Sequence, residues 1–332
     1  MKTILFVSYK FHFIKEYIDY LKIKRYKVLI DEWNGHDNHD ERKSEKLLRQ
    51  SDIIFCEWAL HNAVWYSKKK LPHQKLYIRC HRFELDRGFM WRIRWHNVDR
   101  LIFIAPSVRY RGLELFNHMK KRTLLIYNYV DFNKYNLKKK ADAKFHIGMC
   151  GWHRRLKRMD IAIKIIQNLM RHDKRYKLYF KGISPKKIGW LWNNKEENHY
   201  FTKIFKLLEE DKELSNRVIF EPQGDDVHLW LQNIGYILSC SDIEASHQAV
   251  VEGTSSGAIP CLVGGYVEKY RAKEMFPTSR CFNSIKNLCR NILILNNLES
   301  RRKTEIIQST NYVKNKYNKV KIFKELDKTI IY

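Results

Sequence analysis

Short apolar runs recur along this chain at intervals long enough to hold a helix, and this spacing limits the folds that the chain can adopt. In the first half the runs lie at 4–7, 28–30, 52–56, 76–78, 101–104 and 124–126. In the second half they lie at 146–149, 178–180, 218–220, 236–238 and 259–263. Strands separated by helical crossovers form parallel sheets that helices cover on both faces. The pattern therefore predicts an α/β protein with two doubly wound domains in series.

The length of the chain agrees with two domains. Its 332 residues exceed the size at which one hydrophobic core usually continues to grow. A polar, lysine-rich stretch at 136–144 separates the two series of runs and predicts a linker. We expect a first domain over 1–136, a second over 137–310, and a last segment over 311–332. That segment predicts an amphipathic helix from an apolar stripe of Tyr317, Val320, Ile322, Phe323 and Leu326.

The net charge limits the classes of binding partner that are expected, and the cysteines indicate the cellular compartment. The formal charge of +27 attracts polyanions such as nucleic acid, anionic lipid or phosphate-bearing substrates. The seven cysteines have no CxxC spacing, and most lie in apolar runs, which is typical of small buried side chains in a reducing compartment. No stretch approaches the roughly 20 apolar residues that span a bilayer. We expect a cytoplasmic protein, peripheral on the inner face of the cytoplasmic membrane.

Two glutamates, Glu244 and Glu252, with seven residues between them, lie between two apolar runs. The segment predicts strand, loop, helix and strand, with Glu244 on the loop and Glu252 about two turns into the helix at 1.5 Å rise per residue. In open parallel sheets, ligands bind outside the carboxyl ends of the strands. We therefore expect both carboxylates to face one crevice. The competing interpretation is a solvated helix face, which is common for glutamate pairs in charged helices.

This segment resembles the signature of the retaining, nucleotide-sugar-dependent glycosyltransferases of family 4. The resemblance implies the GT-B fold, with two facing Rossmann-like domains and a C-terminal helix that crosses back to the first domain. Further matches are the turn residues Gly257 and Pro260, the later Gly264, Gly265 and Glu268, and the domain junction residues Asn128, Val130, Asp131 and Phe132. At the junction, Tyr129 replaces a family glycine.

The resemblance also implies roles on the donor side. Glu244 faces the transferred sugar and is the expected catalytic carboxylate, while Glu252 accepts hydrogen bonds from the ribose hydroxyls, which suits the four acceptor sites of a carboxylate. The helix start at His247, Gln248 and Ala249 directs backbone N–H groups towards the diphosphate and the sugar. For His247, a capping or packing role is the alternative.

A basic loop follows the first strand of the second domain. The family pattern here is glycine-arginine followed by lysine-glycine-x-aspartate. Gly151, Lys157 and Asp160 match it, whereas Trp152 and Arg158 replace the arginine and the second glycine. Cations at this place stabilise the negative charge that develops on a leaving diphosphate. We expect Lys157, with Arg154 or Arg155 in the role of the missing arginine, to bind phosphate; the alternative is an ordinary basic surface loop.

The nucleobase is expected on the loops after later strands, at 180–182 and 221–224, although turn formation explains their glycines equally well. In the first domain, the resemblance places His81 at a strand end that reaches towards the sugar, where an imidazole can donate to a hydroxyl, so His81 is expected to be catalytic together with Glu244. A structural role for this histidine is the alternative. Arg82 and Glu84 are expected to flank the cleft. Residues 57–62, with His61 and Asn62, are the expected acceptor loop.

No cofactor and no metal are expected. No Asp-x-Asp follows a strand, and Asp225 and Asp226 precede a helix, where capping is a sufficient role. The partners implied by the resemblance are a nucleotide diphosphate sugar and a glycan or lipid-linked acceptor of bacterial-type surface polysaccharide synthesis. A hydrolase with two carboxylates is the chemical competitor for the glutamate pair, but the nucleotide-binding frame around the pair disfavours it.

The stretch 79–122 combines many arginines and lysines with Trp91 and Trp95, which are four residues apart and are expected to share a helix face. This composition suits the headgroups of an anionic membrane surface. The competing interpretation is that the tryptophans are core residues and the charges form an ordinary solvated face. The same composition is also compatible with nucleic acid. The alternative function is therefore a non-catalytic nucleic-acid-binding protein on a Rossmann-like scaffold, although no helix-turn-helix, zinc-finger or RNA-recognition signature supports it.

Overall fold

The computed structural model describes residues 2–264 and 272–332, and the chain divides into two compact units. The first comprises Met1–Tyr129 and Lys319–Tyr332, and the second comprises Val130–Asn318. The sequence predicts boundaries at 136 and 310, whereas the structure divides the chain after Tyr129 and after Asn318. The second difference arises because one continuous helix, α14 (Glu299–Tyr317), belongs to the second unit as far as its last turn.

In the first unit, the described residues form one six-stranded parallel sheet in the order β2-β1-β3-β4-β5-β6. All six residues of the central strand β1 are buried, whereas the edge strand β2 exposes Lys27 and Glu32. This contrast explains why the central strand is a continuous apolar run and the edge strand is not. The elements are β1 (Thr3–Ser8), α1 (Lys15–Ile23), β2 (Lys27–Glu32), α2 (Glu41–Arg49), β3 (Ile53–Glu57), α3 (His61–Lys69), β4 (Lys75–Cys80), β5 (Arg100–Phe103), α4 (Pro106–Leu115) and β6 (Thr123–Leu125).

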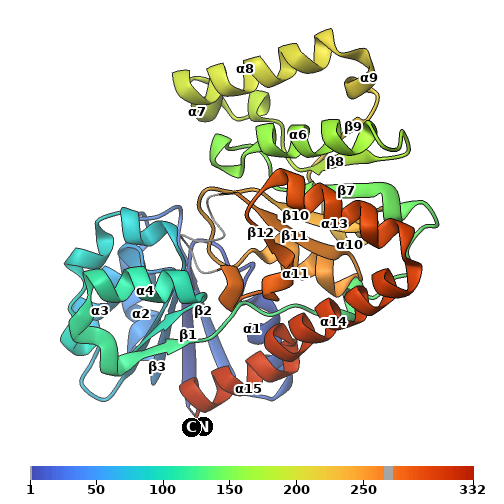
Figure 1. Cartoon of the computed structure of the whole chain (residues 1–332). Helices are drawn as coiled ribbons and strands as arrows, with labels where there is room; N and C mark the ends of the chain where they lie inside the picture. The colour runs from blue at the N-terminus through green and yellow to red at the C-terminus, as the bar shows by residue number, and fades with distance from the viewer. Residues whose placement is uncertain (1, 265–271) are drawn as a thin grey trace. The chain divides into compact units, whose positions relative to one another are not determined.

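The last helix, α15 (Lys319–Ile330), completes the core of the first unit. Its buried side chains Ile322, Phe323, Leu326 and Ile330 join a cluster with Ile4 and Phe6 of β1 and the α1 residue Tyr17. The Tyr17 hydroxyl donates to Asp327 at 2.8 Å. The two ends of the chain lie side by side (Figure 1), and Lys2 Nζ donates to the Ile331 carbonyl at 3.1 Å. The predicted return of the C-terminal helix to the first domain is thus confirmed.

Two members of the predicted stripe do not join that core. Val320 is 60% exposed, and Tyr317 is buried in the second unit at the end of α14, where its hydroxyl donates to the Met275 carbonyl at 3.1 Å. The expected Trp91–Trp95 helix face is also wrong. Each tryptophan lies in its own short 3-10 helix, because the backbone leaves helical geometry at Ile93 and Arg94.

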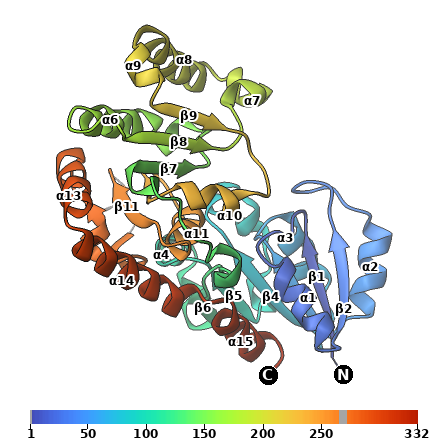
Figure 2. The ribbon, with the colours of Figure 1, turned by 90° about the vertical axis from the view of Figure 1, so that its right-hand side faces the viewer.

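In the second unit, the described residues form a six-stranded parallel sheet in the order β12-β11-β10-β7-β8-β9 (Figure 1). Figure 2 shows its strands β7, β8 and β9 side by side. A core of buried apolar residues lies between this sheet and its helices. The elements are α5 (Phe132–Tyr135), β7 (His146–Cys150), α6 (Met159–Met170), β8 (Lys177–Lys181), α7 (Gly189–Trp192), α8 (Lys195–Glu210), α9 (Lys212–Ser215), β9 (Val218–Glu221), α10 (Val227–Trp230), β10 (Tyr236–Ser239), α11 (Gln248–Ser255), β11 (Ile259–Val263), β12 (Cys281–Phe282), α13 (Ile285–Asn297) and α14.

The predicted α/β class and the two doubly wound sheets are confirmed. Each of the eleven predicted strands has a counterpart among the described residues, from β1 to β11. The additional strand β12 has two residues, which is too short to produce an apolar run. No helix in the described ranges has both the length and the apolarity needed to cross a membrane.

Candidate functional site

The site is built at the point where the strand order of the second sheet reverses. The chain runs from β7 outwards to β8 and β9 and then returns to β10 on the other side of β7. The loops that follow β7 and β10 therefore leave neighbouring strands at the same edge, which is where open α/β sheets bind ligands. A backbone hydrogen bond of 2.8 Å from Asp242 N to the Leu156 carbonyl joins the two loops.

An ion pair between Lys157 and Glu244 connects these loops, with Lys157 Nζ donating to Glu244 Oε1. Ser241 Oγ donates to the same oxygen at 2.9 Å. Burial by itself would raise the pKa of Glu244, but the Lys157 ammonium and the hydrogen bonds outweigh it and lower that pKa to about 2. Glu244 is therefore an anion at neutral pH, and the Lys157 side chain is positioned beside it.

Glu252 lies on α11, whose close approach to the sheet depends on Gly253. A Cβ at that glycine would meet Ile237 Cγ1 of β10 at 2.6 Å, so a larger residue would push the helix away. Burial raises the pKa of Glu252, and hydrogen bonds from Gln248 and Tyr135 partly oppose this shift. The Gln248 Nε2 to Glu252 Oε1 distance is 3.2 Å.

Cys150, at the carboxyl end of β7, shows that the two carboxylates share one neighbourhood. Burial raises the pKa of its thiol to about 12; Glu252 raises it further, whereas Lys157 and Lys181 lower it. Glu252, Lys157 and Lys181 are therefore all within electrostatic reach of one strand end, and Lys157 in turn contacts Glu244. The structure thus brings both predicted glutamates and the predicted lysine to the same edge of the sheet.

The start of α11 is formed by His247, Gln248 and Ala249. The helix begins at Gln248, and the backbone N–H groups of Val250 and Val251 donate to the His247 carbonyl at 2.8 and 3.0 Å. His247 has a left-handed backbone conformation with φ of 46°, makes no side-chain cap, and packs edge-to-face on Phe276 at 5.6 Å between ring centroids. Burial lowers its pKa to about 4, so the ring is neutral at neutral pH.

The two predicted phosphate-binding arginines are both paired with α8. Arg154 Nε donates to Glu197 at 3.1 Å, and Arg155 Nη2 donates to Glu196 at 2.6 Å. The Arg155 backbone N–H also donates to Glu197 at 2.7 Å. The structure therefore places neither guanidinium on Glu244, in contrast to Lys157.

The departures from the family pattern have visible structural consequences. Trp152 is 2% exposed and packs against Phe180, Phe201 and Phe220, so it belongs to the core rather than to a phosphate site. Gly151 has φ of 77°, and its N–H donates to the Lys181 carbonyl at 2.9 Å. These features fix the turn that starts the basic loop.

Arg158 occupies the position of the second family glycine and has φ of 58°, a left-handed conformation that glycine adopts without strain. Its guanidinium donates to both oxygens of Asp160 at 2.9 Å and to Asp242 at 3.0 Å. The arginine thus offsets the backbone cost by tying together the two loops of the site.

Lys181, at the carboxyl end of β8, lies in the segment 180–182 that the sequence offers for the nucleobase, although the sequence does not predict its ion pairing. Its side chain is 3% exposed, and Nζ donates to Asp226 at 2.8 Å and lies 3.9 Å from Glu221. Asp226 was expected to cap the following helix, but its side chain makes no cap and accepts from Lys181 instead. The sequence feature that could have identified Lys181 is its position as a lysine at the end of an apolar strand.

A pocket of about 380 Å³ lies outside the carboxyl ends of β7, β8 and β9. The two loops expected to hold the nucleobase meet in it, since Gly182 comes from one loop and Glu221, Pro222 and Gln223 come from the other. Trp152 and Phe220 provide aromatic walls.

In the first unit, His81 lies at the carboxyl end of β4, beside a buried ion pair. Glu57 is fully buried and receives Arg79 Nη1 at 2.9 Å and His81 Nε2 at 2.8 Å. Trp58 stacks on the His81 ring at 3.8 Å between centroids. Burial lowers the pKa of His81 although Glu57 opposes the shift, so its imidazole tends towards the neutral form.

The other first-unit candidates divide into internal and accessible side chains. Glu84 is fully buried and accepts the backbone N–H groups of His81 at 2.8 Å and Ala59 at 3.3 Å, while burial raises its pKa to about 7. Asn62 is 4% exposed and donates to the Val7 and Glu57 carbonyls. Both therefore support the backbone around the strand ends, rather than flanking a cleft or an acceptor.

Two of these candidates retain access to solvent. His61 begins α3, and its Nδ1 lies 3.1 Å from the Asp37 carbonyl. Arg82 pairs with Asp86 at 3.3 Å. Among residues 2–264 and 272–332, no group of three or more His, Cys, Asp or Glu side chains is arranged to hold a metal ion. Gly265 and Glu268 lie outside the described residues.

The fold of the whole chain is similar to that of HepE from Anabaena, solved in complex with UDP. The TM-score is 0.75 at 13% identity, over 98% of this chain and 99% of that chain. A glycosyltransferase from Rickettsia africae gives 0.74 at 13% identity, over 99% and 97%. Sucrose-phosphate synthase from Thermosynechococcus elongatus gives 0.68 at 12% identity, over 99% and 98%. No family model matches the sequence, and no curated protein matches it significantly. The two six-stranded sheets and these likenesses establish the GT-B fold.

Proposed function

We propose that the protein is a glycosyltransferase that moves a sugar from a nucleotide diphosphate sugar to a glycan or lipid-linked acceptor. The observation that carries this proposal is the ion pair of Glu244 and Lys157, held at the switch point of a GT-B nucleotide-binding unit beside Glu252. Transfer with retention, without a metal and without another cofactor, is part of the proposal and follows from the resemblance to family 4.

Charge development explains the proposed roles. When the glycosidic bond to the nucleotide breaks, negative charge grows on the diphosphate and positive charge grows near the anomeric carbon. Lys157 would stabilise the first charge, and Glu244, ionised because its pKa is about 2, would stabilise the second or accept hydrogen bonds from the sugar. Lys181 is a second cation at this edge, and its burial favours ionic contacts over hydration.

Other residues of the second unit would bind the nucleotide of the donor. Glu252 would bind the ribose hydroxyls, and the pocket walled by Trp152 and Phe220 would take the base. HepE was solved with UDP and with UDP-glucose, and the pneumococcal O-GlcNAc transferase GtfA with UDP and GlcNAc. These complexes support a uridine diphosphate sugar as the first donor to test. Gly151, Arg154 and Arg155 would shape the loop, and His247, Gln248 and Ala249 would direct the start of α11 towards the diphosphate.

On the acceptor side, His81 would contact the sugar or the acceptor. Because Glu57 holds Nε2, Nδ1 is the ring atom that remains for substrate. Trp91 is 64% exposed and packs on Phe116 together with Trp95, which supports a peripheral membrane surface near basic side chains. These features are consistent with a cytoplasmic enzyme of surface polysaccharide synthesis. Such an enzyme would act on lipid-linked acceptors at the inner face of the membrane.

A panel of UDP-, GDP- and CDP-sugars tests the proposal by thermal shift and by release of the nucleotide. At a ligand concentration of about 100 times Kd, binding should stabilise the protein by roughly 2.7 kcal/mol. Glu252→Ala should abolish the shift, whereas Glu209→Ala, an exposed position on α8, should retain it. Binding of random DNA that survives Glu252→Ala, with no response to any nucleotide sugar, would favour the nucleic-acid alternative and overturn the proposal.

A further inference from the structure

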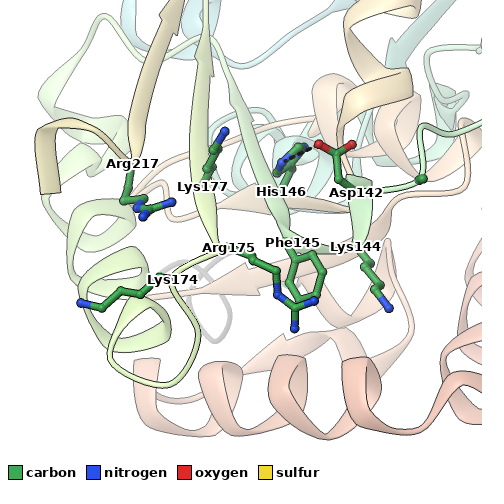
Figure 3. Close-up of a pocket in the computed structure, with 9 residues that line it drawn as sticks. Asp142, Lys144, Phe145, His146, Lys174, Arg175, Lys177 and Arg217 are labelled. Atoms are coloured by element: carbon green, nitrogen blue, oxygen red, sulfur yellow. Dashed lines mark ion pairs between the residues drawn. The ribbon is translucent and has the colours of Figure 1, made fainter. Parts of the chain in front are cut away.

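A second basic pocket, of about 660 Å³, lies at the opposite end of the same three strands (Figure 3). Phe145 and His146 line it at the start of β7, Arg175 and Lys177 at the start of β8, and Arg217 just before β9. Because β7 has five residues, its two ends are separated by roughly 13 Å at 3.3 Å per residue. The pocket is therefore a different place from the candidate donor site.

The charges that line this pocket are strongly unbalanced. Its cations are Lys144, Lys174, Arg175, Lys177 and Arg217, and its one lining carboxylate is Asp142. Lys174 pairs with Glu213, and Arg175 pairs with Asp173 at 2.6 Å. Within the described part of the chain, no carboxylate pairs with Lys144, Lys177 or Arg217.

The remaining polar groups of the lining are Asp142, His146 and the buried part of Arg217. Asp142 lies 3.5 Å from His146 Nε2, while His146 Nδ1 lies 2.9 Å from the Asn233 carbonyl. Arg217 Nε is buried and has no hydrogen-bond partner among the described residues. A buried donor without an acceptor costs free energy, so the protein neighbours of Arg217 leave its hydrogen-bonding capacity partly unused.

One wall of the pocket is an aromatic ring covered by a cation. The Arg175 guanidinium lies over the Phe145 ring at 4.0 Å from the centroid, an arrangement that presents the guanidinium plane rather than the ring. Figure 3 shows Arg175 and Phe145 together, with Arg217 and Lys177 from the neighbouring strand starts. Nε and Nη2 of Arg175 donate to Asp173, so Arg175 contributes charge to this wall while that edge of its guanidinium is already occupied.

We propose that this pocket is a second ligand site, which binds a compact, multiply charged phosphate group of the tripolyphosphate class. Three cations without carboxylate partners in the described residues match several charges within one small ligand, and the Arg217 guanidinium matches its oxygen geometry. The lining contains no exposed large apolar side chain, since Phe145 is 7% exposed beneath Arg175. Docking on a bilayer usually buries such side chains, so the site fits a soluble phosphate ligand better than a lipid surface.

Calorimetric titration with inorganic tripolyphosphate tests the proposal on the full chain. The pocket variant, with Lys144→Gln, Lys177→Gln and Arg217→Gln together, should weaken binding by about tenfold or more. A matched control carries Arg171→Gln, Lys203→Gln and Lys212→Gln, three exposed cations of the same unit that lie outside the pocket lining. Since it loses the same net charge, it should bind within about twofold of the unchanged protein.

Two further arms separate this site from its competitors. Lys157→Gln, in the candidate donor site, should leave tripolyphosphate binding in place. In the unchanged protein, tripolyphosphate should protect Lys144 and Lys177 from acylation, as read by mass spectrometry, and this measurement depends on no variant. Equal weakening in the pocket and control variants, loss only with Lys157→Gln, or binding to phosphatidylglycerol vesicles without binding to tripolyphosphate would each overturn the proposal.

Discussion

Both ends of β7, β8 and β9 carry cations, but the two ends differ in whether all of their main cations are paired with carboxylates. At the carboxyl ends, Lys157 pairs with Glu244 and Lys181 pairs with Asp226. At the amino ends, Lys144, Lys177 and Arg217 have no carboxylate partner in the described ranges. A net charge of +27 therefore says little about either site, because what distinguishes them is how each cation is compensated.

The contrast between paired and unpaired cations suggests a different function for each end of the strands. A compensated cation is held in one position before a ligand arrives, which favours the stabilisation of charge that develops during a reaction. An uncompensated cluster repels itself in the free protein and attracts an anion to relieve that repulsion. The first arrangement suits catalysis on a diphosphate, and the second suits binding.

The largest effect should come from the carboxylate at the carboxyl ends. Glu244→Gln should lower kcat for sugar transfer by roughly 10²- to 10³-fold, because the amide cannot stabilise developing positive charge. Glu209→Gln, on the exposed face of α8, is the matched control and should act within about twofold of the unchanged enzyme. Steady-state kinetics with the best donor of the panel measures both. Near-normal kcat for Glu244→Gln would remove the functional contrast between the two ends.

Two lysines of one strand allow a reciprocal test. Lys181→Met, at the carboxyl end of β8, should weaken nucleotide-sugar binding by about tenfold, since a buried cation contributes strongly to a diphosphate contact. Lys177→Met, at the amino end, should weaken tripolyphosphate binding and leave the nucleotide-sugar Kd unchanged. Calorimetric titration of both ligands into both variants decides this. If each substitution weakened both ligands alike, the two ends would not be separate sites.

Acid should destabilise the carboxyl end selectively. The pKa of Glu244 falls from an ordinary value of 4.5 to about 2 in the folded state, so the Glu244 contribution is present above pH 4.5 and is lost as the pH falls towards 2. At 1.36 kcal/mol per pKa unit this contribution is roughly 3 kcal/mol. Lys157→Gln should therefore lower the urea midpoint at pH 6, and its difference from the unchanged protein should narrow as the pH falls below 4.5 and vanish only near pH 2.

The control for the acid experiment is Lys203→Gln, an exposed cation of α8 with no carboxylate partner in the described residues. Its difference from the unchanged protein should not depend on pH over the same range. His247, whose pKa burial lowers to about 4, loses its own contribution as the pH falls from 6.5 to 4 in the unchanged protein and in this control. A Lys157→Gln difference that stayed constant from pH 6 to pH 3 would contradict the paired arrangement.

The smallest expected effect concerns self-repulsion at the amino ends. The pocket variant with Lys144→Gln, Lys177→Gln and Arg217→Gln should raise the unfolding free energy by a few tenths of a kcal/mol at low salt. The control variant with Arg171→Gln, Lys203→Gln and Lys212→Gln should raise it less. Thermal unfolding at low and high salt measures the difference, which should vanish at about 1 M salt, where screening acts within roughly 3 Å. A lower Tm for the pocket variant would show that these cations are compensated after all.

The strand positions were predictable because parallel strands buried on both faces are continuous apolar runs, as in β1. The proximity of Glu244 and Lys157 was also within reach, because the loops after neighbouring strands meet at one edge. The partners of Arg154 and Arg155 were not predictable. Glu196 and Glu197 are some forty residues further along the chain, and only the packing of α8 brings them to the loop.

Burial also decided the roles of several residues whose positions in the sequence give no indication of whether they lie in the core or at the surface. Glu84 and Arg82 are two residues apart, yet Glu84 is enclosed by backbone donors and Arg82 reaches a solvent-exposed partner. Trp152 stands in place of an arginine, and the sequence alone leaves open whether it faces a ligand or the core. Three phenylalanines from β8, α8 and β9 pack against it, so the side chain is largely in the core and only a small part of it lines the candidate base pocket.

The sequence by itself determined the two parallel sheets, the C-terminal helix as an amphipathic element, and the segment that carries both glutamates, since each depends on periodicity or on neighbours along the chain. Only the tertiary structure decided which cations are compensated, and it alone brought together the basic pocket at the amino ends. That pocket draws on residues near 145, 175 and 217, and no local pattern encodes such a meeting, because it depends on the order in which β7, β8 and β9 pair.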